Sequence, residues 1–475
     1  MDDLKVLVVG AGPAGLTAAY ELSKRKIAVT VLEKDDAVGG IAKTIDHRGY
    51  KFDLGGHRFF TKIQHVKDIW NDVLREDFLI RPRLSRIYYK KKFYNYPLRI
   101  SNVAANLGPA ELMRMTLSYL KAKAQPKKNA ESFEDYITNS FGRRLYEIFF
   151  KSYTEKVWGI PCTALRAEWA AQRVKGMSFS SIVRTALLGN KGGIKSLIEE
   201  FHYPKHGPGQ LWDKVKEKVE AAGGEVLLES EAIKINTEGR KVVSVSATKN
   251  GSTRTYDCVY LISSMPLKDL VERLNPKPPA DVLFAAGKVR YRDFITVALI
   301  VDKEDLWPDN WIYINDKEYL AGRVQNYKNW SPHMAPDRSK SCIGVEYFAF
   351  ENDDLWLMKD EDIIRLATKE LVGLSLLESE SLVEDGKVVR VKKAYPMYDL
   401  TYKENLEKVK NYLSQFQNLH TIGRNGMHCY NNQDHSMLTA ILAVENILGA
   451  SHDIWSVNTA QEYHETDDNK NKAKD

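Results

Sequence analysis

The chain opens with a short apolar run that leads through glycines into a helical pattern. Residues 4–9 are apolar apart from Lys5, the sequence GAGPAG follows, and residues 16–22 repeat apolar positions with a helical period. Strand, glycine turn and helix in this order are typical of a dinucleotide-binding βαβ unit. A second β-branched run at 28–32 ends in Glu33. Glu33 lies about 20 residues beyond the glycines, where a carboxylate accepts hydrogen bonds from a ribose diol.

Each glycine of the first turn meets a different structural requirement. Gly10 permits a tight turn, and Gly12 lets the backbone approach a pyrophosphate. Gly15 lets the helix pack closely on the strand. The pyrophosphate would then meet the free N–H groups at the start of the helix. The turn, the helix and the acid together predict a bound dinucleotide.

Two further glycine pairs decide which dinucleotide to expect. Gly39-Gly40 follows the acidic strand, and Gly55-Gly56 precedes His57. Flavoproteins of the amine-oxidase and glutathione-reductase type use such pairs to bring backbone against FAD, and a plain nicotinamide dehydrogenase has no need of them. We therefore expect FAD rather than NAD.

The later pattern predicts that the FAD domain is assembled from separated segments. Helical periodicity marks residues 106–120, 133–153 and 169–188, and strand-like runs return from 225–228 onward, with Asn250-Gly251 as a hairpin turn. The fold class we expect is α/β, a Rossmann-like (GR2-type) FAD-binding domain with a helical insertion and an antiparallel substrate-facing sheet. The divisions are FAD-binding segment 1 (1–95), a mainly helical insertion (96–195), FAD-binding segment 2 (196–290), the substrate-facing sheet (291–400), FAD-binding segment 3 (401–460) and a disordered tail (461–475).

Composition narrows the class of function. The 475 residues are 43% hydrophobic and 28% charged, as in ordinary globular proteins, and the net charge of +6 lacks the dense basic stripe of a nucleic-acid binder. Four scattered cysteines indicate neither disulfides nor a metal site, which favours a reducing compartment such as the cytoplasm. No uncharged apolar stretch approaches the roughly 20 residues of a membrane span. Peripheral contact with a membrane stays open.

Four short motifs resemble the UDP-galactopyranose mutase family, and the likeness runs along nearly the whole chain. They occur in the family's order: 55–57, 153–159, 171–174 and 423–434. The resemblance implies that reduced FAD attacks the anomeric carbon of a nucleotide sugar through N5, which expels the nucleotide and permits pyranose and furanose forms to interconvert. It further implies a cytoplasmic isomerase of cell-wall polysaccharide biosynthesis, with NADH or NADPH as an open choice of transient reductant. We expect a nucleotide-sugar partner, no nucleic acid and no integral membrane segment, and leave a homo-oligomer open.

The resemblance also assigns residues. Arg323 stands nine residues before Pro332 and Tyr430 six after Arg424, both at the family's spacing. Arginines grip a diphosphate in a bidentate way and stay charged. The candidate catalytic residues are His57, Arg173 and Arg323. The candidate substrate-binding residues are Tyr96, Trp158, Arg173, Arg323, Tyr395 and Tyr430. The candidate cofactor-binding residues are Gly10, Gly12, Gly15, Glu33, Gly39, Gly40, Gly55, Gly56, His57, Val226, Gly423, Arg424, Asn432 and Gln433.

Departures from the family keep other functions open. Asn432 stands where bacterial mutases carry a carboxylate, and residues 427–429 replace a bulkier block, so the positions that contact the sugar are altered. The alternative is an FAD-dependent oxidoreductase like the amine oxidases, protoporphyrinogen oxidases and desaturases, for which we expect an apolar substrate tunnel without a diphosphate clamp. A third is a non-enzymatic relative like the Rab GDP-dissociation inhibitors, against which the three glycine-rich segments argue.

Overall fold

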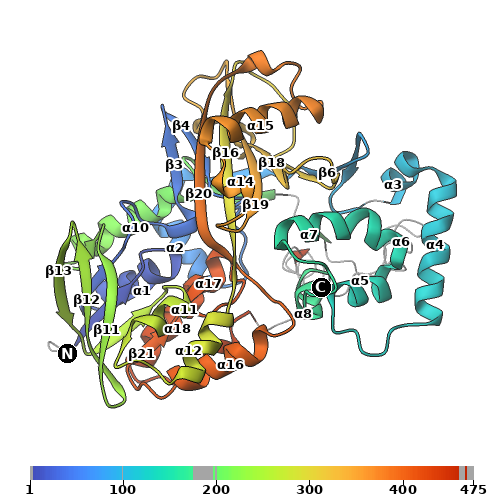
Figure 1. The fold of residues 1–475 in the computed structure, drawn as a ribbon. Helices are drawn as coiled ribbons and strands as arrows, with labels where there is room; N and C mark the ends of the chain where they lie inside the picture. The colour runs from blue at the N-terminus through green and yellow to red at the C-terminus, as the bar shows by residue number, and fades with distance from the viewer. Residues whose placement is uncertain (1–3, 99, 175–195, 198–199, 459–465, 468–475) are drawn as a thin grey trace, which may run out of the picture.

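Two large sheets with their covering helices, and a helical insertion beside them, make up the molecule (Figure 1). The computed structural model describes residues 4–98, 100–174, 196–197, 200–458 and 466–467. Of the predicted tail at 461–475, only Thr466–Asp467 (β22) is described, and it pairs with Ser196–Leu197 (β8). Residues 175–188 of the third predicted helix lie outside the described residues.

A five-stranded parallel sheet has the order β10-β2-β1-β14-β21. Its strands come from distant parts of the chain: β1 (Lys5–Val9), β2 (Ala28–Leu32), β10 (Glu225–Leu227), β14 (Tyr260–Ser263) and β21 (Leu419–Thr421). In β1, Val6 and Val8 pack into one core, and Leu7 and Val9 pack into another on the opposite face. Burial on both faces explains why the strand is a continuous apolar run rather than an alternating one.

Helices cover one face of this sheet, and a four-stranded sheet together with three helices covers the other. The first face packs against α1 (Pro13–Lys24), α2 (Gln64–Leu74), α10 (Gly209–Ala221) and α18 (Gln433–Ile447). The second packs against α11 (Leu267–Arg273), α12 (Ala280–Lys288), α16 (Tyr402–Leu413) and a four-stranded sheet of order β13-β12-β11-β15, formed by β11 (Glu231–Glu238), β12 (Lys241–Lys249), β13 (Ser252–Asp257) and β15 (Leu274–Asn275). This layered arrangement confirms the α/β fold class with a parallel nucleotide-type sheet.

A seven-stranded sheet stands above the first one, with the order β20-β16-β19-β18-β17-β6-β7 (Figure 1). Its strands are β6 (Ser85–Tyr89), β7 (Lys92–Asn95), β16 (Tyr291–Val301), β17 (Trp311–Ile314), β18 (Arg323–Asn326), β19 (Ser341–Ala349) and β20 (Val383–Pro396). Neighbouring strands are antiparallel except β17 and β6. Residues 85–95 fall within the expected FAD-binding segment 1 (1–95) and contribute two strands to this sheet. The hairpin of β6 and β7 joins this sheet because its Ile87 and Tyr88 are buried in the cores on the two faces of the sheet.

Smaller strand pairs and further helices complete the described fold. They are the hairpin of β3 (Thr44–His47) with β4 (Tyr50–Asp53), the pair of β5 (Phe78–Pro82) with β9 (Glu200–Pro204), and the helices α13 (Tyr327–Trp330), α14 (Asp354–Leu357), α15 (Asp360–Gly373) and α17 (Gly423–Gly426).

The helical insertion lies to one side of both sheets (Figure 1). It contains α3 (Ile100–Leu107), α4 (Pro109–Ala124), α5 (Phe133–Phe141), α6 (Arg143–Leu145), a π-helical turn at Tyr146–Lys151, α7 (Ser152–Trp158) and α8 (Ala167–Val174). The single helix predicted over 133–153 is wrong, because Gly142 with φ of 84° interrupts it. A Cβ there would lie 2.7 Å from the Tyr119 nitrogen of α4, so α4 and the chain after α5 approach closely only at a glycine.

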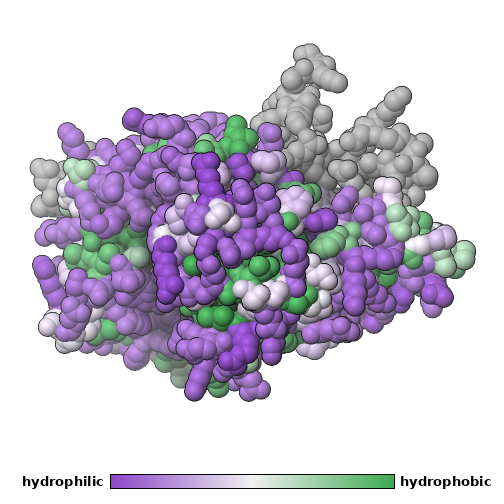
Figure 2. Space-filling view, turned by 90° about the horizontal axis from the view of Figure 1, so that it is seen from above, coloured by the Kyte–Doolittle hydropathy of each residue, from purple (hydrophilic) through white to green (hydrophobic). Residues whose placement is uncertain are grey.

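The viewed surface is mainly hydrophilic, with small separate hydrophobic groups (Figure 2). Among the described helices, none is long and apolar enough to cross a membrane.

Candidate cofactor and substrate site

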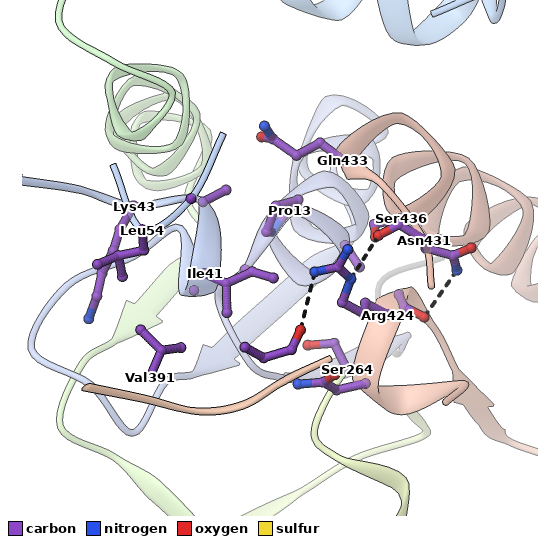
Figure 3. A pocket seen from close by; sticks show the side chains of 18 of the residues that line it. Pro13, Ile41, Lys43, Leu54, Ser264, Val391, Arg424, Asn431, Gln433 and Ser436 are labelled. Carbon is purple, nitrogen blue, oxygen red and sulfur yellow. Dashed lines mark hydrogen bonds between the residues drawn. The ribbon is translucent and has the colours of Figure 1, made fainter. Parts of the chain in front are cut away.

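A cavity of about 850 Å³ opens at the carboxyl ends of β1, β2 and β14. Ligands of parallel α/β sheets bind at this edge, beyond the ends of the strands. Figure 3 shows side chains from several distant segments around the same space, among them Pro13 of α1, Leu54, Val391 of β20 and Arg424 of α17. The second sheet and the nucleotide-type sheet therefore share one cavity.

The glycine turn forms one wall with bare backbone. Gly10 has φ of 97°, and its N–H donates to the Leu32 carbonyl at 2.8 Å. A Cβ on Gly15 would lie 1.8 Å from the Gly10 carbonyl oxygen, so α1 packs on β1 at a distance that only glycine allows. Gly12 caps α1 without a side-chain hydrogen bond, and the first N–H groups of the helix are left for an anion. Gly40 of the second glycine pair faces the Gly12 Cα.

Glu33 lies at the edge of the cavity and is itself held by backbone. Its Oε2 accepts from the Ala11 N–H at 2.6 Å and its Oε1 from the Asp35 N–H at 2.9 Å. Burial raises the pKa of this carboxyl, while the two N–H groups oppose the shift. Residues Ser230, Glu231 and Ala232 line the wall nearby. Val226, which we expected to contact the cofactor, is not among the residues that line the cavity; it lies in the edge strand β10, pairs with Val31 of β2 and packs into the core.

The second wall is built by Gly55, Gly56 and Arg323. Gly55 has φ of 119°, and a Cβ on Gly56 would lie 3.3 Å from Arg323 Nη1. Arg323 Nε donates to Glu346 Oε2 at 2.6 Å, and Gln325 Nε2 bonds the other oxygen of Glu346. Burial alone would lower the pKa of the Arg323 guanidinium. The charge of Glu346 outweighs this effect and raises that pKa well above its usual range. The cavity therefore holds a permanent cation whose counter-ion is buried.

His57 lies near the guanidinium groups of Arg424 and Arg323. Burial, followed by the nearby charges of Arg424 and Arg323, lowers the pKa of His57 to about 3. The imidazole is therefore neutral at physiological pH. Its Nδ1 is buried and has no hydrogen-bond partner among the described residues, and neither has Asn425 Oδ1.

Arg424 and two tyrosines form the third wall, and Figure 3 shows Arg424 near Asn431. Arg424 Nε donates to the Asn431 carbonyl at 3.0 Å, and Nη1 donates to the Ala394 carbonyl at 3.2 Å. The guanidinium carbon lies 4.3 Å from the ring centroid of Tyr430 and 5.5 Å from that of Tyr395. The two rings stack with centroids 5.7 Å apart and planes 18° apart. Burial raises the pKa of Tyr395, so its hydroxyl stays protonated as a hydrogen-bond donor.

The structure brings most of the predicted site residues to this cavity. The ones that line it are Gly10, Gly12, Glu33, Gly40, Gly55, Gly56, His57, Arg323, Tyr395, Gly423, Arg424, Tyr430, Asn432 and Gln433. Gly15 and Gly39 lie behind the wall, where Gly39 donates its N–H to the Ala11 carbonyl at 2.8 Å. Arg173 belongs to α8, but its side chain lies outside what the structure describes.

Two predicted aromatic residues support the wall from behind. Trp158 is 1% exposed, with its ring edge-on to Tyr395 and Tyr430 at centroid distances of 6.3 Å and 6.5 Å. The Tyr96 ring is edge-on to Tyr313, which lines the cavity, at 5.2 Å. Neither residue is among those that line the cavity.

Several lining residues were not expected from the sequence. Phe294 and Trp311 form part of the wall, and Tyr313 meets the α7 residue Tyr153 edge-on at 5.2 Å. Glu346, the partner of Arg323, could have been noticed in the sequence, because it is the one acidic residue in the largely apolar strand β19. No local pattern distinguishes the three aromatic residues from core residues.

These residues fit FAD at three points. The glycine turn presents bare backbone and the start of α1 to a pyrophosphate, and Glu33 lies where a ribose would be held. The orphaned polar atoms of His57 and Asn425 would be satisfied by the polar edge of a bound group.

A family model described as flavin containing amine oxidoreductase matches residues 13–408. The chain belongs to this family. The assignment supports FAD as the cofactor and an enzyme as the kind of protein, and it gives no support for NADH or NADPH.

The similar proteins include a mutase and an oxidase. A probable UDP-galactopyranose mutase of Klebsiella pneumoniae is 27% identical over 176 residues, which are 35% of this chain and 44% of that protein. Protoporphyrinogen oxidase 2 of Arabidopsis thaliana is 23% identical over 464 residues, 87% of this chain and 88% of that protein. A crystal structure of reduced UDP-galactopyranose mutase superposes with a TM-score of 0.84 at 22% identity and covers 98% of this chain and 99% of that one. This superposition shows that the two chains share a fold.

Proposed function

We propose that the protein is an FAD-dependent nucleotide-sugar mutase that interconverts the pyranose and furanose forms of the sugar. The observation that carries this proposal is that two guanidinium groups line one cavity beside His57: that of Arg323, which we expected to bind the substrate, and that of Arg424, which we expected to bind the cofactor. A diphosphate is bound well by two planar cations that stay charged. An apolar substrate gains nothing from two guanidinium groups, whose desolvation costs free energy.

Each wall of the cavity has a task in this reaction. The start of α1 and the glycine turn hold the cofactor pyrophosphate. When bound and reduced, FAD supplies the nucleophile for the anomeric carbon. Arg323 and Arg424 stabilise the charge that develops on the leaving diphosphate and keep it in place until the sugar ring has closed again. Tyr395 and Tyr430 donate hydrogen bonds from their hydroxyl groups to phosphate oxygens.

His57 serves as a neutral hydrogen-bonding group in this account. A pKa of about 3 leaves it without a proton to give at physiological pH, so it is no general acid. Phe294, Trp311 and Tyr313 keep water from the reacting carbon because they give the cavity an apolar part of its wall.

The alternative function is that of an FAD-dependent oxidoreductase. It is favoured by the long match to a protoporphyrinogen oxidase and by the same three aromatic side chains, which suit an apolar substrate. Oxygen consumption with amines and porphyrinogens tests it.

Nucleotide binding tests the proposed role of the arginines. We expect UDP to change the flavin spectrum of the loaded protein, with affinity falling about tenfold or more in Arg323→Lys, since the bidentate fork is lost. Arg390→Lys is the matched control. Arg390 lines the same cavity but donates to the Trp356 carbonyl at 3.0 Å and the Met358 carbonyl at 2.6 Å. Equal UDP affinities in both variants would contradict the proposal.

A further inference from the structure

Helix α4 carries a second apolar stripe on the side that faces away from the protein. Met115 is buried against the rest of the helical insertion, whereas Met113, Leu117 and Leu120 are 62%, 60% and 56% exposed. Positions i, i+4 and i+7 fall on one side of a helix, so the three side chains form a continuous stripe. In Figure 1, α4 is the outermost helix of the insertion, away from both sheets, and none of its residues lines the cavity.

The charges beside this stripe have one sign. Lys121 and Lys123 lie in the last turn of α4, and Lys128 follows in the connection to α5. Within the described ranges, no carboxylate forms an ion pair with any of these three lysines. The acid of this helix, Glu111, is directed to the inner side, where it pairs with Arg144 and lies 3.3 Å from Arg114. Lys127 pairs with Asp135.

We propose that the outer face of α4, formed by Met113, Leu117, Leu120, Lys121 and Lys123, docks on the surface of an anionic lipid bilayer. An exposed apolar stripe with basic flanks is the arrangement of a helix that lies in the plane of the membrane interface. The apolar side chains enter the boundary between headgroups and acyl chains, while the lysines meet the negative headgroups. The proposal concerns a surface outside the cavity and does not depend on the reaction.

A second copy of the chain fits this face less well. A two-fold contact places the same patch on both partners, so the positive flanks of one copy would face those of the other. Like charges brought together at a desolvated contact are unfavourable, and this face offers no carboxylate to compensate them. The sign of the charge therefore favours an anionic surface over self-association.

Vesicle flotation with the full, flavin-loaded protein tests the docking. The probes are vesicles of phosphatidylcholine alone and of phosphatidylcholine mixed with phosphatidylglycerol. We expect binding to the anionic vesicles, little binding to the neutral ones, and release at high salt. Leu117→Glu should lower the bound-to-free ratio about tenfold. Lys121→Glu with Lys123→Glu should lower it about fivefold for each lysine.

Leu357→Glu is the matched control, because Leu357 of α14 is 69% exposed on a different part of the molecule. It should bind the anionic vesicles like the wild type, and the flavin spectrum of every variant reports correct folding. Failure of the wild type to float with anionic vesicles at low salt would overturn the proposal, as would equal losses in Leu117→Glu and Leu357→Glu. A dimer in solution that Leu117→Glu converts to a monomer would assign the face to a second copy and would overturn it too.

Discussion

Glu346 lies fully buried beside Arg323, with its Oε2 2.6 Å from both Nε and Nη2 of the guanidinium. The two residues are direct neighbours across the antiparallel strands β18 and β19. The register of this sheet therefore places a cation in the cavity and fixes its orientation. The pair forms at the point where the second sheet meets the glycine loop at 55–56.

Glu346→Gln should destabilise the protein by about 3 kcal/mol, because it leaves the Arg323 charge buried without its partner. Urea unfolding of the two proteins measures the difference. Glu384→Gln is the control, since Glu384 pairs with Lys340 at the surface and its loss should cost no more than about 1 kcal/mol. Similar costs for both changes would refute the importance of the buried pair.

Arg323→Lys should lower kcat/KM for a nucleotide sugar by about 100-fold while FAD stays bound, because lysine offers a single point charge in place of a planar fork. Steady-state turnover with the flavin content of each sample measured beside it checks this. A variant that loses FAD together with activity would place Arg323 in cofactor binding instead.

Gly15→Ala should prevent FAD binding, because the new Cβ would lie 1.8 Å from the Gly10 carbonyl and force α1 away from β1. The flavin absorbance of the purified variant reports this directly. Gly287→Ala in α12 is the control, since nothing lies within 4 Å of its added Cβ. It should retain flavin and gain about 0.5–1 kcal/mol of stability, as a helical alanine does. Full flavin content in Gly15→Ala would disprove the account of this turn.

Asp53 should make the stability of the protein depend on pH. Burial raises its pKa to about 7, against the opposing hydrogen bonds of Tyr203 and Thr44. A carboxyl whose pKa is raised on folding binds its proton more tightly in the native state. The protonated carboxyl of Asp53 therefore contributes to the free energy of unfolding below the unfolded pKa of about 4, and this contribution is lost as the pH rises to 7. The free energy of unfolding, followed from pH 4 to 8, should fall by about 4 kcal/mol more in the wild type than in Asp53→Asn. Parallel curves for the two proteins would contradict this origin.

Lys156→Met should loosen the connection between the helical insertion and the second sheet. The Lys156 ammonium of α7 donates to the carbonyls of Ile314, Asp316 and Ala321 at 3.0, 2.6 and 3.1 Å, just before Arg323. We expect a loss of about 3 kcal/mol, since three partly buried carbonyls lose their donor. Faster amide exchange over residues 314–322 would be the matching local signature. Unchanged exchange there would rule out this connection.

Local chemistry made part of the site predictable from the sequence. The glycine turn and Glu33 lie within one βαβ unit, so spacing along the chain gives their arrangement. Arg323 was expected from a motif, but its partner Glu346 depends on strand register between distant segments, which periodicity does not encode. The position of Val226 outside the cavity lining has the same origin, since its surroundings come from pairing with β2. The interruption at Gly142 reflects tertiary contact with α4, which overrides a helical pattern.

Turnover of nucleotide sugars by the reduced protein tests the central claim most directly. UDP-hexopyranoses and their furanose isomers are incubated with the FAD-loaded protein, with and without dithionite, and the products are separated by chromatography. We predict interconversion of ring forms only in the reduced sample, without net consumption of reductant, and its loss in Arg323→Lys. No conversion of any nucleotide sugar by the reduced protein, together with oxygen consumption on an amine or a porphyrinogen, would contradict the account.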